Sequence, residues 1–162
     1  MHWMPCCGLA VVLSVVPSAW AGPHVDLIDF PRTEANWDRA YDLEAALAAE
    51  FSALCADTLC EGDYSNYRVM QFRCAVREQA GTVQRCAWVV AASELAVQAD
   101  TGVIQVADGR WVCPVDLRPG VPVEAFHASL AAPGGLVAPL PVVGRSLFSG
   151  LFECLQGPGV QP

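Results

Sequence analysis

Apolar residues recur at intervals of three and four within residues 34–57, which is the spacing that places them along one side of an α-helix. This stripe consists of Ala40, Leu43, Leu47, Phe51 and Leu54. Thr33 precedes it as a candidate N-cap, and Glu34 adds the negative charge that is favoured in a first helical turn. The pattern predicts a long amphipathic helix that begins near Glu34 and ends near Asp57.

The pattern then changes to alternation, which is typical of β-strands with one buried face. Two strands joined by a turn at residues 79–82 are predicted, with Tyr67 on the outward face. Their inward residues are Met70, Phe72, Cys74, Val76, Cys86, Trp88, Val90 and Ala92. Turn signals at residues 99–102 and 107–109 enclose a short segment, and a further strand follows with Trp111 and Cys113 inward. Because these turns are too closely spaced for helical crossovers, we expect an antiparallel meander of four to five strands.

The remainder of the chain is expected to hold short C-terminal helices. Pro122 can start one of them, residues 132–144 read as a loop, and Ser146 can cap the last helix. The predicted fold class is therefore α+β, with a long N-terminal helix packed on the meander and disulfide bonds stapling the fold. We expect one domain at residues 34–156, an extended lead-in at residues 22–33 and a loose tail at residues 157–162.

Residues 1–21 are predicted to form a cleavable signal peptide. A short apolar run at residues 9–16 is followed by Pro17 and by the small-x-small pattern of Ala19 and Ala21. The run is about half as long as a membrane-spanning helix requires. A lipid anchor is not expected, because Cys6 and Cys7 precede the run. The alternative is a short buried helix. Export would place the mature chain in the periplasm or outside the cell, where cysteines oxidise.

Six cysteines remain after residue 21, and an even number in an oxidising compartment predicts three disulfides. Cys74 and Cys86 flank a hairpin turn symmetrically, so they can face each other across two strands. The other expected pairs are Cys55 with Cys60 and Cys113 with Cys154. Zinc is the other common use of cysteines, but the chain has no C-x-x-C pair and only three histidines.

The net charge of −8 is concentrated near one end of the chain. Residues 22–66 contain ten acidic residues and two arginines, whereas the rest of the chain is close to neutral. A surface of this kind repels nucleic acid and anionic membranes and attracts basic proteins. The alternative interpretation is that the charge serves solubility alone.

The candidate recognition segment lies between the predicted helix and the sheet. It combines acids, aromatics and an amide in Glu61, Asp63, Tyr64, Asn66 and Tyr67. Rigid tyrosines and hydrogen-bonding side chains suit contact with a partner protein. Ordinary turn chemistry is the competing explanation, and a calcium loop is a third, although the acids lack the alternation of an EF-hand.

No catalytic motif is found in the sequence, and the chain is not expected to be an enzyme or to need a cofactor. His127 with Glu124 resembles an ordinary helix-surface pair, and Trp37, Trp88 and Trp111 are expected to pack in the core. The sequence thus favours an exported binding module that docks a partner protein, as periplasmic inhibitors and immunity proteins do. A carrier of a small apolar ligand between helix and sheet is the alternative, and an enzyme of unknown class is a distant third.

Overall fold

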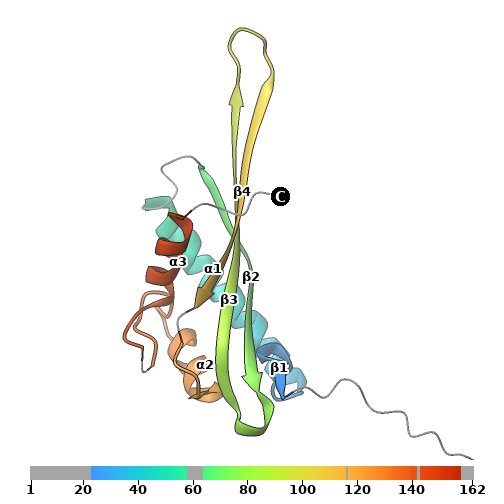
Figure 1. The fold of residues 1–162 in the computed structure, drawn as a ribbon, viewed down its shortest axis with the longest axis vertical. Coiled ribbons are helices and arrows are strands. Elements are labelled where there is room, and N and C mark those ends of the chain that lie inside the picture. The colour runs from blue at the N-terminus through green and yellow to red at the C-terminus, as the bar shows by residue number, and fades with distance from the viewer. Residues whose placement is uncertain (1–22, 58–63, 116, 142, 158–162) are drawn as a thin grey trace, which may run out of the picture.

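The computed structural model describes residues 23–57, 64–115, 117–141 and 143–157. Its centre is an antiparallel sheet in the order β1–β2–β3–β4, with β5 paired to β3. Figure 1 shows helix α1 on one side of this sheet and helices α2 and α3 beside it. The predicted α+β class with an antiparallel sheet is confirmed.

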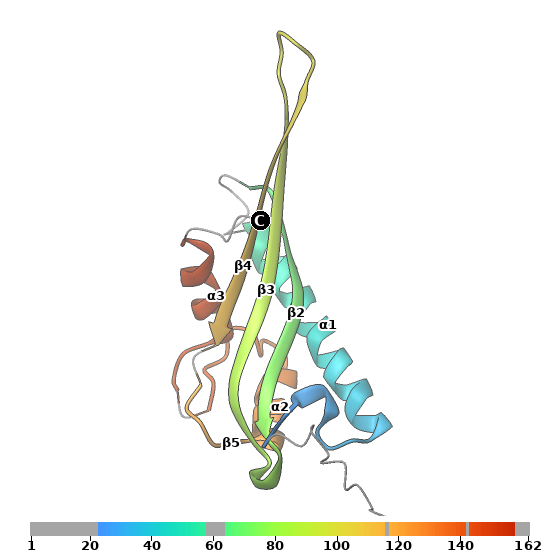
Figure 2. The same cartoon turned by 45° about the vertical axis from the view of Figure 1, so that its right-hand side comes forward.

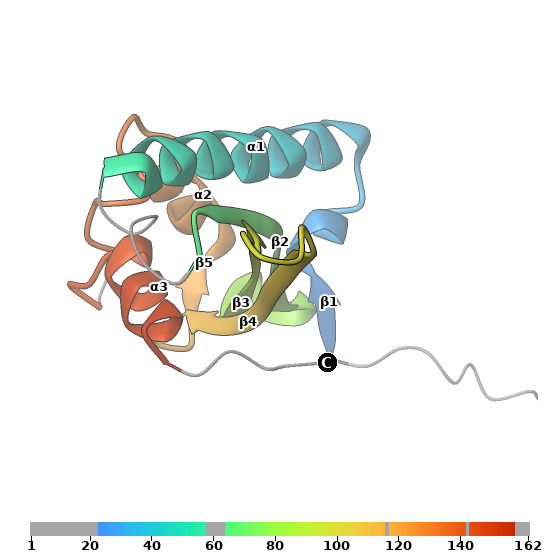
Figure 3. The same cartoon turned by 90° about the horizontal axis from the view of Figure 1, so that it is seen from above.

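Helix α1 (Glu34–Asp57) has the predicted bounds. Its apolar stripe faces the core, where Leu43, Leu47 and Phe51 are buried. The Thr33 hydroxyl oxygen accepts a hydrogen bond from the backbone N–H of Asn36 at 3.2 Å, as a capping residue does. Seen from above in Figure 3, the helix runs across the top of the curled sheet, next to β2.

Two short elements precede α1, so the long helix is not the first element of the fold. Strand β1 (His24–Asp26) pairs with β2 in antiparallel register, with Val25 opposite Val76. A 3₁₀ turn, η1 (Leu27–Asp29), follows and buries Leu27 in the core. Residues 24–29 therefore belong to the folded body, which the expectation of a merely extended lead-in did not include.

Strand β2 (Asn66–Arg77) contains a bulge that reverses part of the predicted alternation. Its register with β3 shifts between Val69 and Gln71, so Met70 is an extra residue in the ladder and is 60% exposed. The inward position predicted for Met70 is wrong. Tyr67 was expected to face outward, but it lies opposite the buried Ala92 and packs against the core.

Strands β3 (Thr82–Val97) and β4 (Ile104–Val115) form one long hairpin. The turn predicted at residues 99–102 joins them, whereas the turn predicted at residues 107–109 is wrong, because β4 runs through it. Figures 1 and 2 show that the distal end of this hairpin extends well beyond the body. We call residues 94–107 the arm.

The predicted short C-terminal helices are present, and they pack against the sheet. Strand β5 (Val121–Pro122) leads into α2 (Val123–Ala131), and α3 (Leu147–Leu155) begins after the Ser146 cap, whose hydroxyl accepts from the Ser149 N–H. The core lies between the sheet and the three helices, and its largest buried side chains include Trp88, Phe51 and Phe126.

Two of the predicted disulfides are confirmed. Cys74–Cys86 joins β2 to β3, and Cys113–Cys154 joins β4 to α3. Cys55 is also disulfide-bonded, and its predicted partner Cys60 lies outside the described residues, as does the predicted signal peptide. The disulfides indicate an oxidising compartment. None of the helices within the described ranges is long and apolar enough to cross a membrane.

Candidate binding surfaces

The outer side of α1 presents two large aromatic side chains to solvent. Trp37 is 45% exposed and Tyr41 is 56% exposed, and the two residues are one helical turn apart. The expectation that Trp37 packs in the core is therefore wrong, although Trp88 and Trp111 are buried as expected. Trp37 faces outward because it lies off the stripe formed by Leu43 and Leu47, whose burial fixes the rotation of the helix.

Carboxylates surround these two rings. Glu34, Asp38 and Asp42 are exposed on the same part of α1. The Trp37 indole N–H donates a 3.3 Å hydrogen bond to a carboxylate oxygen of Asp29 in η1, which ties the ring to the preceding turn. We call this surface the aromatic-acidic face, defined as Asp29, Glu34, Trp37, Asp38, Tyr41 and Asp42. Sequence reasoning missed it, although two aromatics at helical spacing off the apolar stripe were the available signal.

Two other acids of α1 are used inside the fold and do not belong to this surface. Glu44 accepts a hydrogen bond from the Phe72 N–H at 2.7 Å and pairs with Arg73 at 3.0 Å. Glu50 accepts from the backbone N–H groups of Gly134 and Leu136, both at 2.9 Å. These carboxylates satisfy backbone donors that the sheet and helices leave open. Within the described part of α1, the exposed acids Glu34, Asp38 and Asp42 lie in its first half.

A polar network holds the start of α1 in place. Buried Asn36 donates to the carbonyls of Leu27 and Ile28 at 3.2 and 2.8 Å, and its own oxygen accepts from Arg39 Nε at 2.9 Å. Arg39 in turn donates two parallel hydrogen bonds, of 2.7 and 2.8 Å, to the Glu124 carboxylate on α2. This bidentate contact lowers the pKa of Glu124 and raises that of Arg39. The network fixes η1, α1 and α2 relative to one another.

His127 lies beneath this network on α2 and was not expected to be buried. It is only 6% exposed, and its Nε2 atom has no hydrogen-bond partner in the described part of the chain. Burial and the nearby Arg39 guanidinium lower its pKa, while the Glu124 carboxylate opposes that shift. Packing on the buried side of α2, beside Phe126 and Leu130, accounts for this enclosed imidazole.

Three residues of the predicted recognition segment are described, and they lie at the base of the arm. The Tyr64 and Tyr67 rings contact the Trp111 ring, with centroids 5.6 and 5.7 Å away. The Tyr64 hydroxyl donates to the Asp108 carbonyl at 3.1 Å, and exposed Asn66 donates to the Ser93 hydroxyl at 3.2 Å. Both tyrosines are half-buried, so they support the aromatic cluster. Glu61 and Asp63 lie outside the described residues.

Ser65 and Glu94 form hydrogen bonds at the same place. The Glu94 carboxylate accepts from the Ser65 hydroxyl, and from its backbone N–H at 3.0 Å. These bonds lower the pKa of Glu94. These hydrogen bonds connect Ser65, just before β2, to the point where the arm leaves the body.

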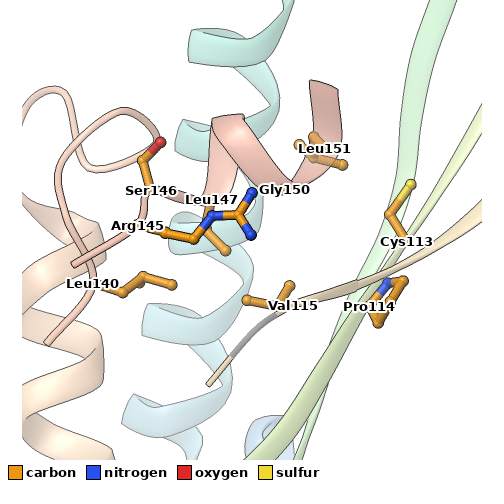
Figure 4. Close-up of a pocket in the computed structure, with 9 residues that line it drawn as sticks. All are labelled: Cys113, Pro114, Val115, Leu140, Arg145, Ser146, Leu147, Gly150 and Leu151. Atoms are coloured by element: carbon orange, nitrogen blue, oxygen red, sulfur yellow. The ribbon is translucent and has the colours of Figure 1, made fainter. Parts of the chain in front are cut away.

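Open hollows of about 450 and 480 Å³ lie beside β1–β3 and on the arm, whereas two cavities that border the core are small. One of about 10 Å³ lies between β4 and α3, and Figure 4 shows Val115 on one side of it with Leu140 and Leu147 on the other. Another of about 20 Å³ lies between α1, η1 and β2, beside Leu43 and Phe72. Spaces of this size hold about one water molecule.

Metal-ligating side chains do not gather within the described ranges, since no three histidine, cysteine or acidic residues there could hold one ion. Comparison with known protein families, with curated proteins and with solved structures finds no match to this chain.

Proposed function

We propose that this protein is an exported binding module that docks a basic partner protein through the aromatic-acidic face of α1, in the manner of a periplasmic inhibitor or immunity protein. The observation that carries the proposal is the exposure of Trp37 and Tyr41, at 45% and 56%, among four carboxylates. Large aromatics left in solvent at this density are typical of residues that anchor protein interfaces.

The chemistry of the face selects a cationic partner. An arginine or lysine side chain can lie over the Trp37 or Tyr41 ring, where the negative face of the π-system attracts it. Asp38 and Asp42 are neighbours of these rings in the helix and can accept hydrogen bonds from the same cation. The summed negative potential would also speed the approach of a basic protein.

The face is built to bind without rearrangement. The Trp37 ring is tied to Asp29, and the backbone beneath it is held by the contacts of Asn36 and Arg39. Side chains that are already ordered lose little conformational entropy on binding, so more of the contact energy appears as affinity.

The carrier alternative requires a ligand-sized pocket between α1 and the sheet. A pocket for a small apolar ligand has a volume of about 300 Å³ or more. The cavity found between α1 and the sheet measures about 20 Å³.

A labelled octa-arginine peptide, titrated by fluorescence anisotropy, tests the cation preference of the face. We expect binding that weakens with added salt and is reduced about tenfold or more by Asp38→Asn with Asp42→Asn. The charge-matched control is Glu78→Gln with Asp100→Asn, which removes two exposed acids elsewhere. If both double variants weaken binding equally, the attraction is a property of net charge and the face has no special role.

A further inference from the structure

The arm carries an apolar face that the body does not cover. Pairing between β2 and β3 extends only to Asn66 opposite Ser93, so beyond this point the described hairpin has two strands. Leu95 lies directly opposite Val106, and Val97 lies opposite Ile104, which places all four side chains on one face. Their exposed fractions are 63%, 67%, 69% and 63% in that order.

Such a face is unusual on an isolated hairpin. A two-stranded hairpin is marginally stable in water, and it normally needs an apolar face packed on something else. The four aliphatic side chains make a patch of the order of the largest found on monomeric proteins, about 300–600 Å². The edges of both strands also offer unpaired backbone groups.

We propose that the arm is a dimerisation device whose partner is the arm of a second copy of this chain. In this arrangement the arms overlap face to face in opposite directions, with the two bodies at opposite ends. Leu95 then faces Val97 of the partner subunit, and Ile104 faces Val106 of the partner subunit. Each larger side chain meets a smaller one, so the two faces interdigitate, and the same patch serves both copies as a twofold interface requires.

The charge distribution favours a second copy over an unrelated charged partner. Within the arm the charged residues are Glu94, which lies on the opposite face, and Asp100, which lies in the turn at the tip. The exposed acids Glu34, Asp38 and Asp42 belong to the start of α1, which Figure 1 shows at the end of the molecule away from the tip of the arm. Overlapping arms keep the two acidic regions apart by more than the Debye length of about 8 Å at physiological salt.

The area that the two arm faces can bury indicates how stable the dimer is. Two faces together bury roughly 600–1,200 Å², at or just below the lower limit of stable interfaces. We therefore expect a reversible dimer that forms in the micromolar range. The proposal is independent of the function of α1, since none of the arm residues belongs to the aromatic-acidic face.

Sedimentation equilibrium of the mature protein, from about 1 µM to about 300 µM, tests the proposal. The expected result is a monomer–dimer equilibrium whose dissociation constant rises more than about tenfold in Leu95→Ser with Ile104→Ser. The matched control is Val137→Ser, since Val137 is 49% exposed and lies outside the arm. Circular dichroism would verify that each variant is folded.

A second measurement keeps the test independent of these variants. A photo-crosslinking amino acid at position 97 should join two copies, with the adduct mapped to the partner's arm. A monomer over the whole concentration range would overturn the proposal, and so would a dimer that the double serine variant leaves intact. A monomer that instead binds phosphatidylglycerol vesicles through the arm would assign this face to lipid and would also overturn it.

Discussion

A Cβ atom placed on Gly109 would lie 2.6 Å from the Cη2 atom of the Trp111 ring. The indole lies across the backbone of β4 at this point, and the Tyr64 hydroxyl approaches the same position to 3.2 Å. The glycine is therefore present to let an aromatic ring approach the strand. Asp108 and Gly109, whose sequence resembles a turn, continue the strand here and pair with Ser93 and Ala92.

Gly109→Ala is expected to destabilise the protein by about 1–3 kcal/mol, because the new methyl group forces Trp111 out of its place. Urea unfolding followed by circular dichroism measures the change. The matched control is Gly150→Ala in α3, where an added Cβ meets nothing within 4 Å. That helix-interior substitution should stabilise the protein by up to about 1 kcal/mol. Equal effects of the two substitutions would contradict the role given to Gly109.

Tyr64→Ala and Tyr67→Ala should each lower the free energy of unfolding by about 1–3 kcal/mol, less than a fully buried aromatic would cost. The reason is their contact with Trp111. Tyr64→Phe retains the ring and removes only the hydrogen bond to the Asp108 carbonyl, so its cost should not exceed about 1 kcal/mol. Unchanged melting curves for both alanine variants would show that these rings are free to serve recognition alone.

Stability should fall as the pH drops below about 6.5, in part because of His127. Its pKa is lowered in the folded state by burial and by Arg39, so the unfolded chain takes up a proton first and is favoured by acid. His127→Leu should make the free energy of unfolding depend less on pH between about 7 and 5. The Arg39–Glu124 contact is lost only at lower pH, where Glu124 becomes protonated, because the pKa of Glu124 lies below its usual 4.5. An unchanged pH profile in the leucine variant would contradict the burial of a neutral imidazole.

Removing the Cys113–Cys154 bond should destabilise the protein more than removing Cys74–Cys86. The two bonds span 41 and 12 residues, and the entropy of loop closure then gives about 4 and about 3 kcal/mol. Two variants, each with both cysteines of one bond replaced by serine, measure the two losses when they are unfolded in urea. A larger loss from the Cys74–Cys86 pair would mean that chain entropy does not decide the order.

Elements set by periodicity were predictable, and those set by backbone irregularity were not. The stripe of Leu43, Leu47 and Phe51 follows from helical periodicity, and the start of α1 follows from the Thr33 cap. The bulge at Met70 leaves no clear mark in the sequence, because one extra residue in a strand changes the pairing and not the composition. The short strand β1 depends on pairing with residues far along the chain, such as Val25 with Val76.

The candidate surfaces were harder to predict than the fold. A helical spacing alone does not say that Trp37 is exposed, since aromatic residues most often add to the core. The alternation of Leu95, Val97, Ile104 and Val106 resembles an ordinary buried face, but the strand register places it on the side of the sheet opposite Val90 and Ala92, away from the core. Both surfaces become visible when the neighbouring elements are in place.

The most direct test of the proposed function is photo-crosslinking at position 41 in cells that produce and export the protein. Tyr41 is 56% exposed on the aromatic-acidic face, and Val137, at 49%, gives a control position of similar exposure elsewhere. We predict an adduct with a basic exported protein from position 41, absent from position 137 and lost when Trp37→Ala is added. No adduct at position 41, an adduct with an acidic protein, or the same adduct from both positions would contradict the proposal.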